Sequence, residues 1–183
     1  MRIVATTGMP GSGKGEALKF FEKAGIPAFV MRTVIQAELE KRGIPLNNRT
    51  LREFATELRK KEGMDIVARM CVPAITELAK KHDVILVDGI RSYAEVKFFK
   101  EKFTQDFVLI AIHAPPKLRF ERLKARRERW DMDAWEEFVW RDEKELGWGL
   151  GDAIALADFI VDNSGTLEQM HSQLKKVLKA IQK

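Results

Sequence analysis

Short apolar runs alternate with longer segments in which apolar residues recur at helical spacing. Four runs are apolar at almost every position and lie at residues 3–7, 84–87, 107–112 and 159–161, with a weaker fifth run at 27–31. None of them alternates apolar with polar residues, so each is expected to be a strand buried on both faces. Strands separated by helical segments predict an α/β fold, in which a five-stranded parallel sheet lies between two helical layers.

A glycine-rich loop follows the first apolar run and precedes a helical segment over residues 16–24. Its residues are Gly8, Met9, Pro10, Gly11, Ser12, Gly13, Lys14 and Gly15. Strand, loop and helix together match the phosphate-binding P-loop, G-x-x-x-x-G-K, up to its last position. Glycines let backbone N–H groups approach a phosphate, and the helix N-terminus and a lysine add positive charge. All eight residues are therefore predicted to hold the phosphates of ATP, and a glycine-rich turn without a ligand is the alternative.

The residue after the P-loop lysine is Gly15, where the usual pattern has a Ser or Thr whose hydroxyl ligates Mg²⁺. The run Val84-Ile85-Leu86-Val87 leads into Asp88, which is the Walker B pattern of an apolar strand followed by a metal-holding carboxylate. Asp88 is therefore the candidate Mg²⁺ residue, and the alternative is a turn aspartate before Gly89.

Arginines are concentrated at two places that bear on phosphate chemistry. Arg91 follows the apolar run 84–87 in the sequence, so it is expected on the ligand side of the sheet, where it could hold an acceptor phosphate, and a surface arginine that pairs with Asp88 or Glu95 is the alternative. Four further arginines, spaced by three, four and three residues, would share one stripe of a helix: Arg119, Arg122, Arg126 and Arg129. Arg127 lies next to this stripe in the sequence. We expect this stripe to face phosphate oxygens, and a solvated helix face is the alternative.

Two helical insertions are expected to cover this core without forming a second domain, so that residues 1–183 make one domain. The first spans about 32–62 as two helices broken at Gly43-Ile44-Pro45, and the second spans about 126–151 as a lid. All four tryptophans lie in or beside the lid. Trp135 has helical spacing with Phe138 and Val139, so it is expected to pack within the lid, and stacking on a nucleobase is the alternative. Arg141 and Glu143 could pair or clamp there.

Composition narrows the class of protein. The 183 residues are 45% hydrophobic and carry 32 basic and 27 acidic side chains, a net charge of +5 that suits anionic ligands. The sequence has no apolar run of about 18 residues, no room for a signal peptide before the first strand, and a single cysteine, Cys71, expected to be buried. A cytoplasmic protein without a membrane partner is expected. The three histidines show no metal-ligand spacing.

The motifs resemble those of nucleotide kinases. The loop Gly8 to Gly15 is similar to the adenylate kinase form G-x-P-G-x-G-K-G-T, and Asp88-Gly89-Ile90-Arg91 resembles that family's D-G-[FY]-P-R without its proline. The tail at 157–168 is similar to the end of dephospho-coenzyme A kinases. Over nearly its whole length, including the stretch at 141–149, the chain resembles an archaeal group of adenylate-kinase-like proteins.

This resemblance implies ATP and Mg²⁺ at the P-loop, an acceptor under the first insertion, and a lid carrying Arg122, Arg126 and Arg141. Lys14, Arg91 and these lid arginines would be the catalytic residues. The sequence departs from the adenylate kinase pattern at Glu16, where that family has Thr, and at Gln36, where it has an acceptor-binding Arg.

The sequence therefore predicts a P-loop phosphotransferase of the nucleoside monophosphate kinase type, acting on a small phosphorylated nucleotide substrate as a monomer or homodimer. A dephospho-coenzyme A kinase-like enzyme is one alternative. A nucleotide-gated NTPase that binds RNA or protein is another, although nucleic acid is not the favoured partner.

Overall fold

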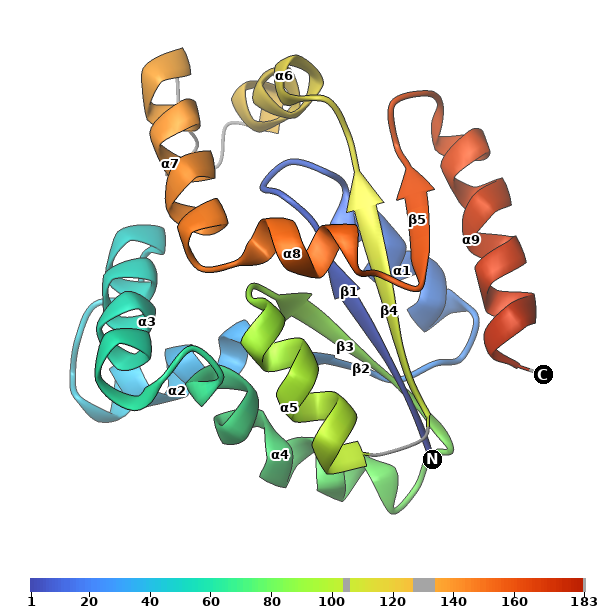
Figure 1. Cartoon of the computed structure of the whole chain (residues 1–183), viewed down its shortest axis with the longest axis horizontal. Coiled ribbons are helices and arrows are strands. Elements are labelled where there is room, and N and C mark those ends of the chain that lie inside the picture. The colour runs from blue at the N-terminus through green and yellow to red at the C-terminus, as the bar shows by residue number, and fades with distance from the viewer. Residues whose placement is uncertain (104–105, 127–133, 183) are drawn as a thin grey trace.

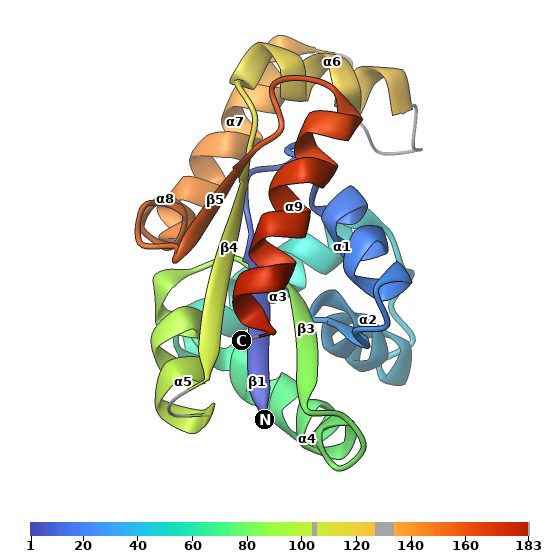
Figure 2. The same cartoon turned by 90° about the vertical axis from the view of Figure 1, so that its right-hand side faces the viewer.

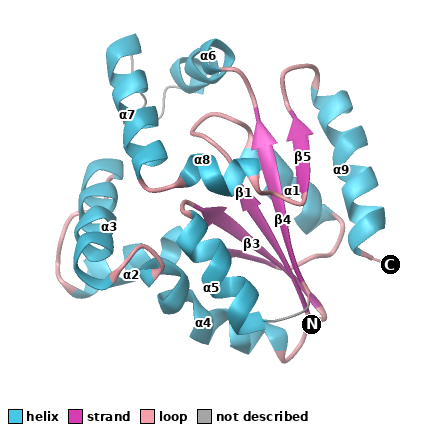
Figure 3. Cartoon of the chain, in the orientation of Figure 1, coloured by secondary structure: helices cyan, strands magenta, loops and turns pink. Residues whose placement is uncertain are grey.

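The computed structural model describes residues 1–103, 106–126 and 134–182, and its centre is a five-stranded parallel sheet (Figure 1, Figure 3). The strand order is β2-β3-β1-β4-β5, and every neighbouring pair is parallel. The strands are β1 (Arg2–Thr7), β2 (Ala28–Val30), β3 (Val84–Ile90), β4 (Phe107–His113) and β5 (Phe159–Asp162). The predicted α/β fold with its five-stranded parallel sheet is confirmed.

Helices cover both faces of the sheet (Figure 2). The segment that follows β1 forms α1 (Lys14–Lys23), and α9 (Leu167–Ile181) lies beside it on the same face. The opposite face carries α4 (Ile66–Ala79), α5 (Tyr93–Phe103) and α8 (Leu150–Ala155). The remaining helices lie beyond the sheet and are α2 (Arg32–Lys41), α3 (Asn48–Glu62), α6 (Pro116–Arg126) and α7 (Trp135–Gly147). No described helix is both long enough and apolar enough to cross a membrane.

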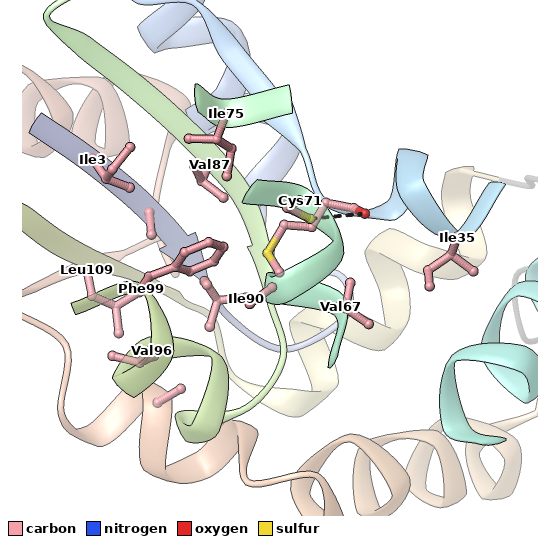
Figure 4. Close-up of a cluster of buried hydrophobic side chains, with 14 of the residues drawn as sticks. Ile3, Ile35, Val67, Cys71, Ile75, Val87, Ile90, Val96, Phe99 and Leu109 are labelled. Carbon is pink, nitrogen blue, oxygen red and sulfur yellow. Dashed lines mark hydrogen bonds between the residues drawn. The ribbon is translucent and has the colours of Figure 1, made fainter. Parts of the chain in front are cut away.

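The apolar strands are buried on both faces, as their sequences predict. In β1, Ile3 and Ala5 join the cluster under α4 and α5, whereas Val4, between them, joins the cluster under α1 and α9. Cys71 lies in the first cluster, with its Sγ 4.0 Å from the Met31 carbonyl oxygen (Figure 4). Burial raises the pKa of this thiol far above its usual range, which makes Cys71 an unreactive packing residue as expected.

Local capping explains where several helices begin. At α5, the Ser92 hydroxyl accepts from the Glu95 N–H at 3.2 Å and the Glu95 carboxylate accepts from the Ser92 N–H at 3.2 Å, a reciprocal capping box.

The first insertion is helical as predicted: α2 ends at Lys41, and α3 begins after Asn47, whose side chain accepts from the N–H groups of Arg49 and Thr50.

The second insertion has a small apolar core of its own, formed between α6 and α7. Leu123 and Phe138 are buried there. The Phe120 and Trp135 rings meet edge to face at 5.3 Å, and Trp135 also contacts Phe138 at 5.1 Å. The predicted packing role of Trp135 is confirmed. Arg127, Arg129 and Trp130 lie outside the described residues.

Candidate active site

The glycine-rich loop joins β1 to α1 and is pinned against the ends of β4 and β5. Gly8 has φ +147°, and a Cβ there would lie 2.4 Å from the Ile112 carbonyl oxygen. Gly13 has φ +106°, and a Cβ there would lie 2.1 Å from Nδ2 of Asn163. Both positions therefore require glycine, because a Cβ would clash with a backbone oxygen at Gly8 and with a side-chain amide at Gly13.

Lys14 folds back over this loop. Its Nζ donates to the Gly8 carbonyl oxygen at 2.6 Å and to that of Met9 at 3.3 Å. Burial, reinforced by the nearby Arg91 guanidinium, lowers the pKa of Lys14 from 10.5 to about 7, although Asp88 and Glu145 act in the opposite direction. A polyanion at the loop would stabilise the charged ammonium, so this lysine is poised to respond to phosphate.

Ser12 lies at the centre of the loop and is 1% exposed. Its carbonyl oxygen accepts from Asn163 Nδ2 at 2.8 Å, whereas its buried Oγ has no hydrogen-bond partner in the described part of the chain. A buried hydroxyl without a partner is costly in a folded protein, and it lies in the segment expected to meet phosphate. The sequence analysis did not identify Asn163, which follows β5 and supports the loop from the side.

Asp88 faces β1 from within β3. The strand continues to Ile90, so Asp88 does not end the strand as the sequence pattern suggested, and the register shifts at Gly89. The Thr6 hydroxyl donates to the Asp88 carboxylate. Among the described residues, no group of three or more His, Cys, Asp or Glu side chains could hold a metal ion. A Mg²⁺ ion held by Asp88 would therefore need phosphate and water oxygens as its other ligands.

A cavity of about 690 Å³ opens in front of the loop. All six side chains that the sequence singled out for catalysis or metal binding line it: Lys14, Asp88, Arg91, Arg122, Arg126 and Arg141. The loop also contributes Pro10, Gly11, Gly13 and Gly15, whereas Gly8, Met9 and Ser12 are not among the lining residues. Gly15 is open, with no atom within 4 Å of an added Cβ, so nothing steric excludes a side chain there.

A buried acid from the lid holds two of these arginines. Arg91 Nη1 donates to Glu145 Oε2 at 2.5 Å, and the Arg141 Nε lies 4.0 Å from Glu145 Oε1. Burial alone would raise the pKa of Glu145, but Arg91 and Arg141 hold it below its ordinary value. The buried acid was not predicted from the sequence, which drew attention to Glu143 two residues earlier: Glu143 is exposed, whereas Glu145 is 3% exposed.

The arginine stripe of α6 divides into two roles. Arg122 and Arg126 line the cavity, and Arg122 also donates to the Asn163 carbonyl oxygen at 2.9 Å. Arg119 is 3% exposed and is fully engaged with protein groups: it donates to Asp142 of α7 at 2.5 and 2.9 Å and to the Pro10 carbonyl oxygen at 3.0 Å. The expectation that Arg119 faces phosphate is therefore wrong, because this guanidinium ties the lid to the P-loop.

The part of the cavity away from the loop has cations that the sequence analysis missed. Arg32 of α2 and Arg52 and Arg59 of α3 line it, as does Trp148 after α7. Gln36, the position at which adenylate kinases have an acceptor-binding arginine, is not among the lining residues. A signal was present in the sequence, since Arg52 and Arg59 lie seven residues apart and share a helix face.

Comparisons with known proteins show the family of this chain. A family profile described as an AAA domain matches residues 7–139. A UPF0200/UPF0201 protein of Archaeoglobus fulgidus is 44% identical over 97% of this chain, although the chain spans only 55% of that relative's length. A UPF0200 protein of Pyrococcus horikoshii is 41% identical over 98% of this chain and 97% of its own.

Solved structures share the fold at low sequence identity. TT1252 from Thermus thermophilus has a TM-score of 0.69 at 20% identity, covering 98% of this chain and 97% of its own. A shikimate kinase from Bacteroides thetaiotaomicron has a TM-score of 0.63 at 16% identity, covering 100% and 99%. A gluconokinase from Sinorhizobium meliloti has a TM-score of 0.56 at 13% identity, covering 99% and 95%. With the P-loop in place and relatives matched along its length, the chain belongs to the UPF0200 family, and its fold is that of the P-loop kinases.

Proposed function

We propose that this protein is an ATP-dependent phosphotransferase of the nucleoside monophosphate kinase type, which moves the γ-phosphoryl group of ATP to a small phosphorylated acceptor. The observation that carries this proposal is a single cavity lined at once by the P-loop, Asp88 and seven arginines. A site built for water as the acceptor would not need arginines on both sides of the reacting phosphate.

The residues that line the cavity would have different roles in phosphoryl transfer. The loop backbone and Lys14 hold the β- and γ-phosphates, and the unpartnered Ser12 hydroxyl and Arg122 Nη1 are buried donors that phosphate oxygens can satisfy. Mg²⁺, when bound with ATP through Asp88 and water, would neutralise charge on the β- and γ-oxygens. Arg91 holds the acceptor phosphate.

The lid arginines stabilise the charge that spreads over the transferring group. Arg122, Arg126 and Arg141 come from α6 and α7, so closing these helices over the cavity excludes water and favours transfer over hydrolysis. An acceptor phosphate is already an anionic nucleophile, so no side chain has to act as a strong base.

ATP consumption with and without a panel of nucleotide and coenzyme acceptors tests the proposal. Release of ADP that depends on one acceptor, with the phosphoryl group recovered on that acceptor, is the expected result. Lys14→Ala should lower the rate at least about 100-fold. Full turnover in that variant would contradict the scheme.

A nucleotide-gated NTPase that binds RNA or protein is the second candidate, favoured by the missing hydroxyl at Gly15 and the net charge of +5. The same assay separates the two functions. Slow ADP release that ignores every small acceptor and changes when RNA is added would support the gate and overturn the kinase.

A further inference from the structure

The cavity has two chemically different halves. We call the residues from α2, α3 and α4 the acceptor half: Arg32, Ile35, Leu51, Arg52, Ala55, Arg59 and Val67. The acids that line the cavity, Glu16, Asp88 and Glu145, come from α1, β3 and α7. Among the described lining residues, the acceptor half thus contains three arginines and no acid.

One face of α3 presents two of these arginines to the cavity. Arg52, Ala55 and Arg59 are separated by three and four residues, which places them on one stripe of the helix. Seven residues correspond to about 10 Å along a helix, so Arg52 and Arg59 are about two turns apart. Arg49, on the same helix, does not line the cavity, pairs with Glu53 at 2.8 Å and is 80% exposed.

Arg59 is connected through Glu95 to Arg91, the residue proposed to hold the acceptor phosphate. Its Nη2 donates to Glu95 Oε1 at 2.8 Å, and the other oxygen of that carboxylate accepts from the Arg91 N–H at 2.7 Å. The Arg59 guanidinium lies over the Trp148 ring, 4.7 Å from its centroid. Its Nε is buried without a hydrogen-bond partner in the described part of the chain, although the side chain is only 4% exposed. An anionic ligand in the cavity would satisfy this donor.

Arg52 is the contrasting residue. It lies two turns from Arg59 and lines the same cavity, but its side chain has no ion pair or hydrogen bond to any described residue. Arg32, at the start of α2, also lines the cavity and also has no such partner among the described residues. An arginine that lines a cavity beside apolar Leu51 and Ala55, with no ion-pair partner among the described residues, is typical of a subsite for a ligand anion. One acceptor phosphate at Arg91 and Arg59 would leave this subsite unused.

We propose that the acceptor carries two anionic groups: the phosphate that receives the phosphoryl group, held by Arg91 and Arg59, and a second phosphate or carboxylate held by Arg52 together with Arg32. The apolar wall between the two arginines of α3 would contact the carbon skeleton that joins them. This inference rests on the proposed kinase function and narrows its substrate class from phosphorylated compounds in general to small bis-anions.

Calorimetric titration with matched probe pairs tests the inference on the full chain, saturated with Mg²⁺ and a non-hydrolysable ATP analogue. The pairs are AMP with adenosine 3′,5′-bisphosphate, fructose 6-phosphate with fructose 1,6-bisphosphate, and glycerol 3-phosphate with 3-phosphoglycerate. The first two pairs add a phosphate and the third adds a carboxylate, so they also distinguish the nature of the second group. In at least one pair, the second anionic group should tighten binding about tenfold or more.

Arg52→Gln should abolish that advantage and leave the affinity for the single-anion probe unchanged. Arg49→Gln removes the same charge from the same helix outside the cavity and should leave both affinities unchanged. Arg52 has no internal partner to lose, so this variant should fold, and its thermal unfolding checks that directly.

The outcomes separate the two proposals. If the ATP analogue does not bind, the kinase function fails and this inference fails with it. If the analogue binds but no pair shows an advantage for the second anion, or if Arg52→Gln keeps the advantage, the bis-anion is overturned while the kinase function stands.

Discussion

The two halves of the cavity use positive charge differently. Near the P-loop, the cations have internal partners: Lys14 with the Gly8 carbonyl oxygen, Arg91 with Glu145, and Arg122 with the Asn163 carbonyl oxygen. In the acceptor half, Arg59 pairs with Glu95, but Arg32 and Arg52 have no side-chain partner among the described residues. A cationic side chain that the protein holds in place is preorganised for one ligand position. A cationic side chain without an internal partner can be balanced by an anionic ligand. Under the proposed function, the partnered cations would serve the nucleotide and the unpartnered ones would serve the acceptor.

The largest effect should come from disturbing the preorganised half. Gly8→Ala puts a Cβ 2.4 Å from a backbone oxygen at φ +147°, so we expect it to destabilise the fold by about 2–4 kcal/mol and to abolish ATP binding. Gly15→Ala, in the same loop, has open space and should change stability by less than about 0.5 kcal/mol. Thermal unfolding and calorimetry measure both. Equal effects of the two variants would contradict the described geometry.

The next effect concerns Lys14 and pH. Its pKa is about 7 in the folded protein and 10.5 when unperturbed, so the unfolded chain binds more protons between these values. The free energy of unfolding should therefore rise from pH 7 to pH 9, by about 1–2 kcal/mol relative to a Lys14→Met variant measured in parallel. Comparing the two proteins cancels the contribution of other titrating groups. A rise that is the same in both proteins would show that Lys14 is not the source.

Substitution of Glu145 tests whether this internal carboxylate competes with a ligand phosphate for Arg91. Replacing its carboxylate with the neutral amide in Glu145→Gln leaves the charge of Arg91 available, so the affinity for a phosphate monoester should rise about tenfold. Glu143→Gln removes an equal charge from the exposed face of the same helix and should have no effect. If Glu145→Gln binds phosphate more weakly, Glu145 positions Arg91 instead of competing for it.

Gly15→Ser should have the smallest effect. An added Cβ meets no atom within 4 Å, and a hydroxyl at this P-loop position usually ligates Mg²⁺, so the affinity for ATP should increase two- to fivefold, by less than about 1 kcal/mol, and only when Mg²⁺ is present. Titration with and without Mg²⁺ measures this. An increase that is equal without Mg²⁺ would mean that the hydroxyl contacts phosphate, not metal.

The sequence predicted the fold and the side chains that line the cavity near the P-loop because both depend on local patterns. Apolar runs such as Val84–Val87 and the spacing of glycines around Lys14 carry their meaning within a few residues. The order of the strands then places Asp88 beside Thr6 of β1, since parallel strands present their carboxyl ends at one edge of the sheet. Arg122 and Arg126 were found by their helical spacing.

The rest depends on tertiary contacts that no local pattern encodes. Arg119 shares the spacing of Arg122, but Asp142 and the Pro10 carbonyl oxygen hold it away from the cavity. Glu145 and Glu143 are two residues apart, and only the packing of α7 decides which of them is buried. Asn163 contacts the loop across more than 150 positions of sequence, and its place in the tail gave no indication of this contact.

One titration tests the central claim most directly: calorimetry of ATP with Mg²⁺ into the wild-type protein, with Lys14→Ala alongside. The account predicts saturable binding at one site per chain in the wild type and a loss of at least about tenfold in affinity in the variant. No heat of binding from well-folded wild-type protein, or equal affinity in both proteins, would contradict it.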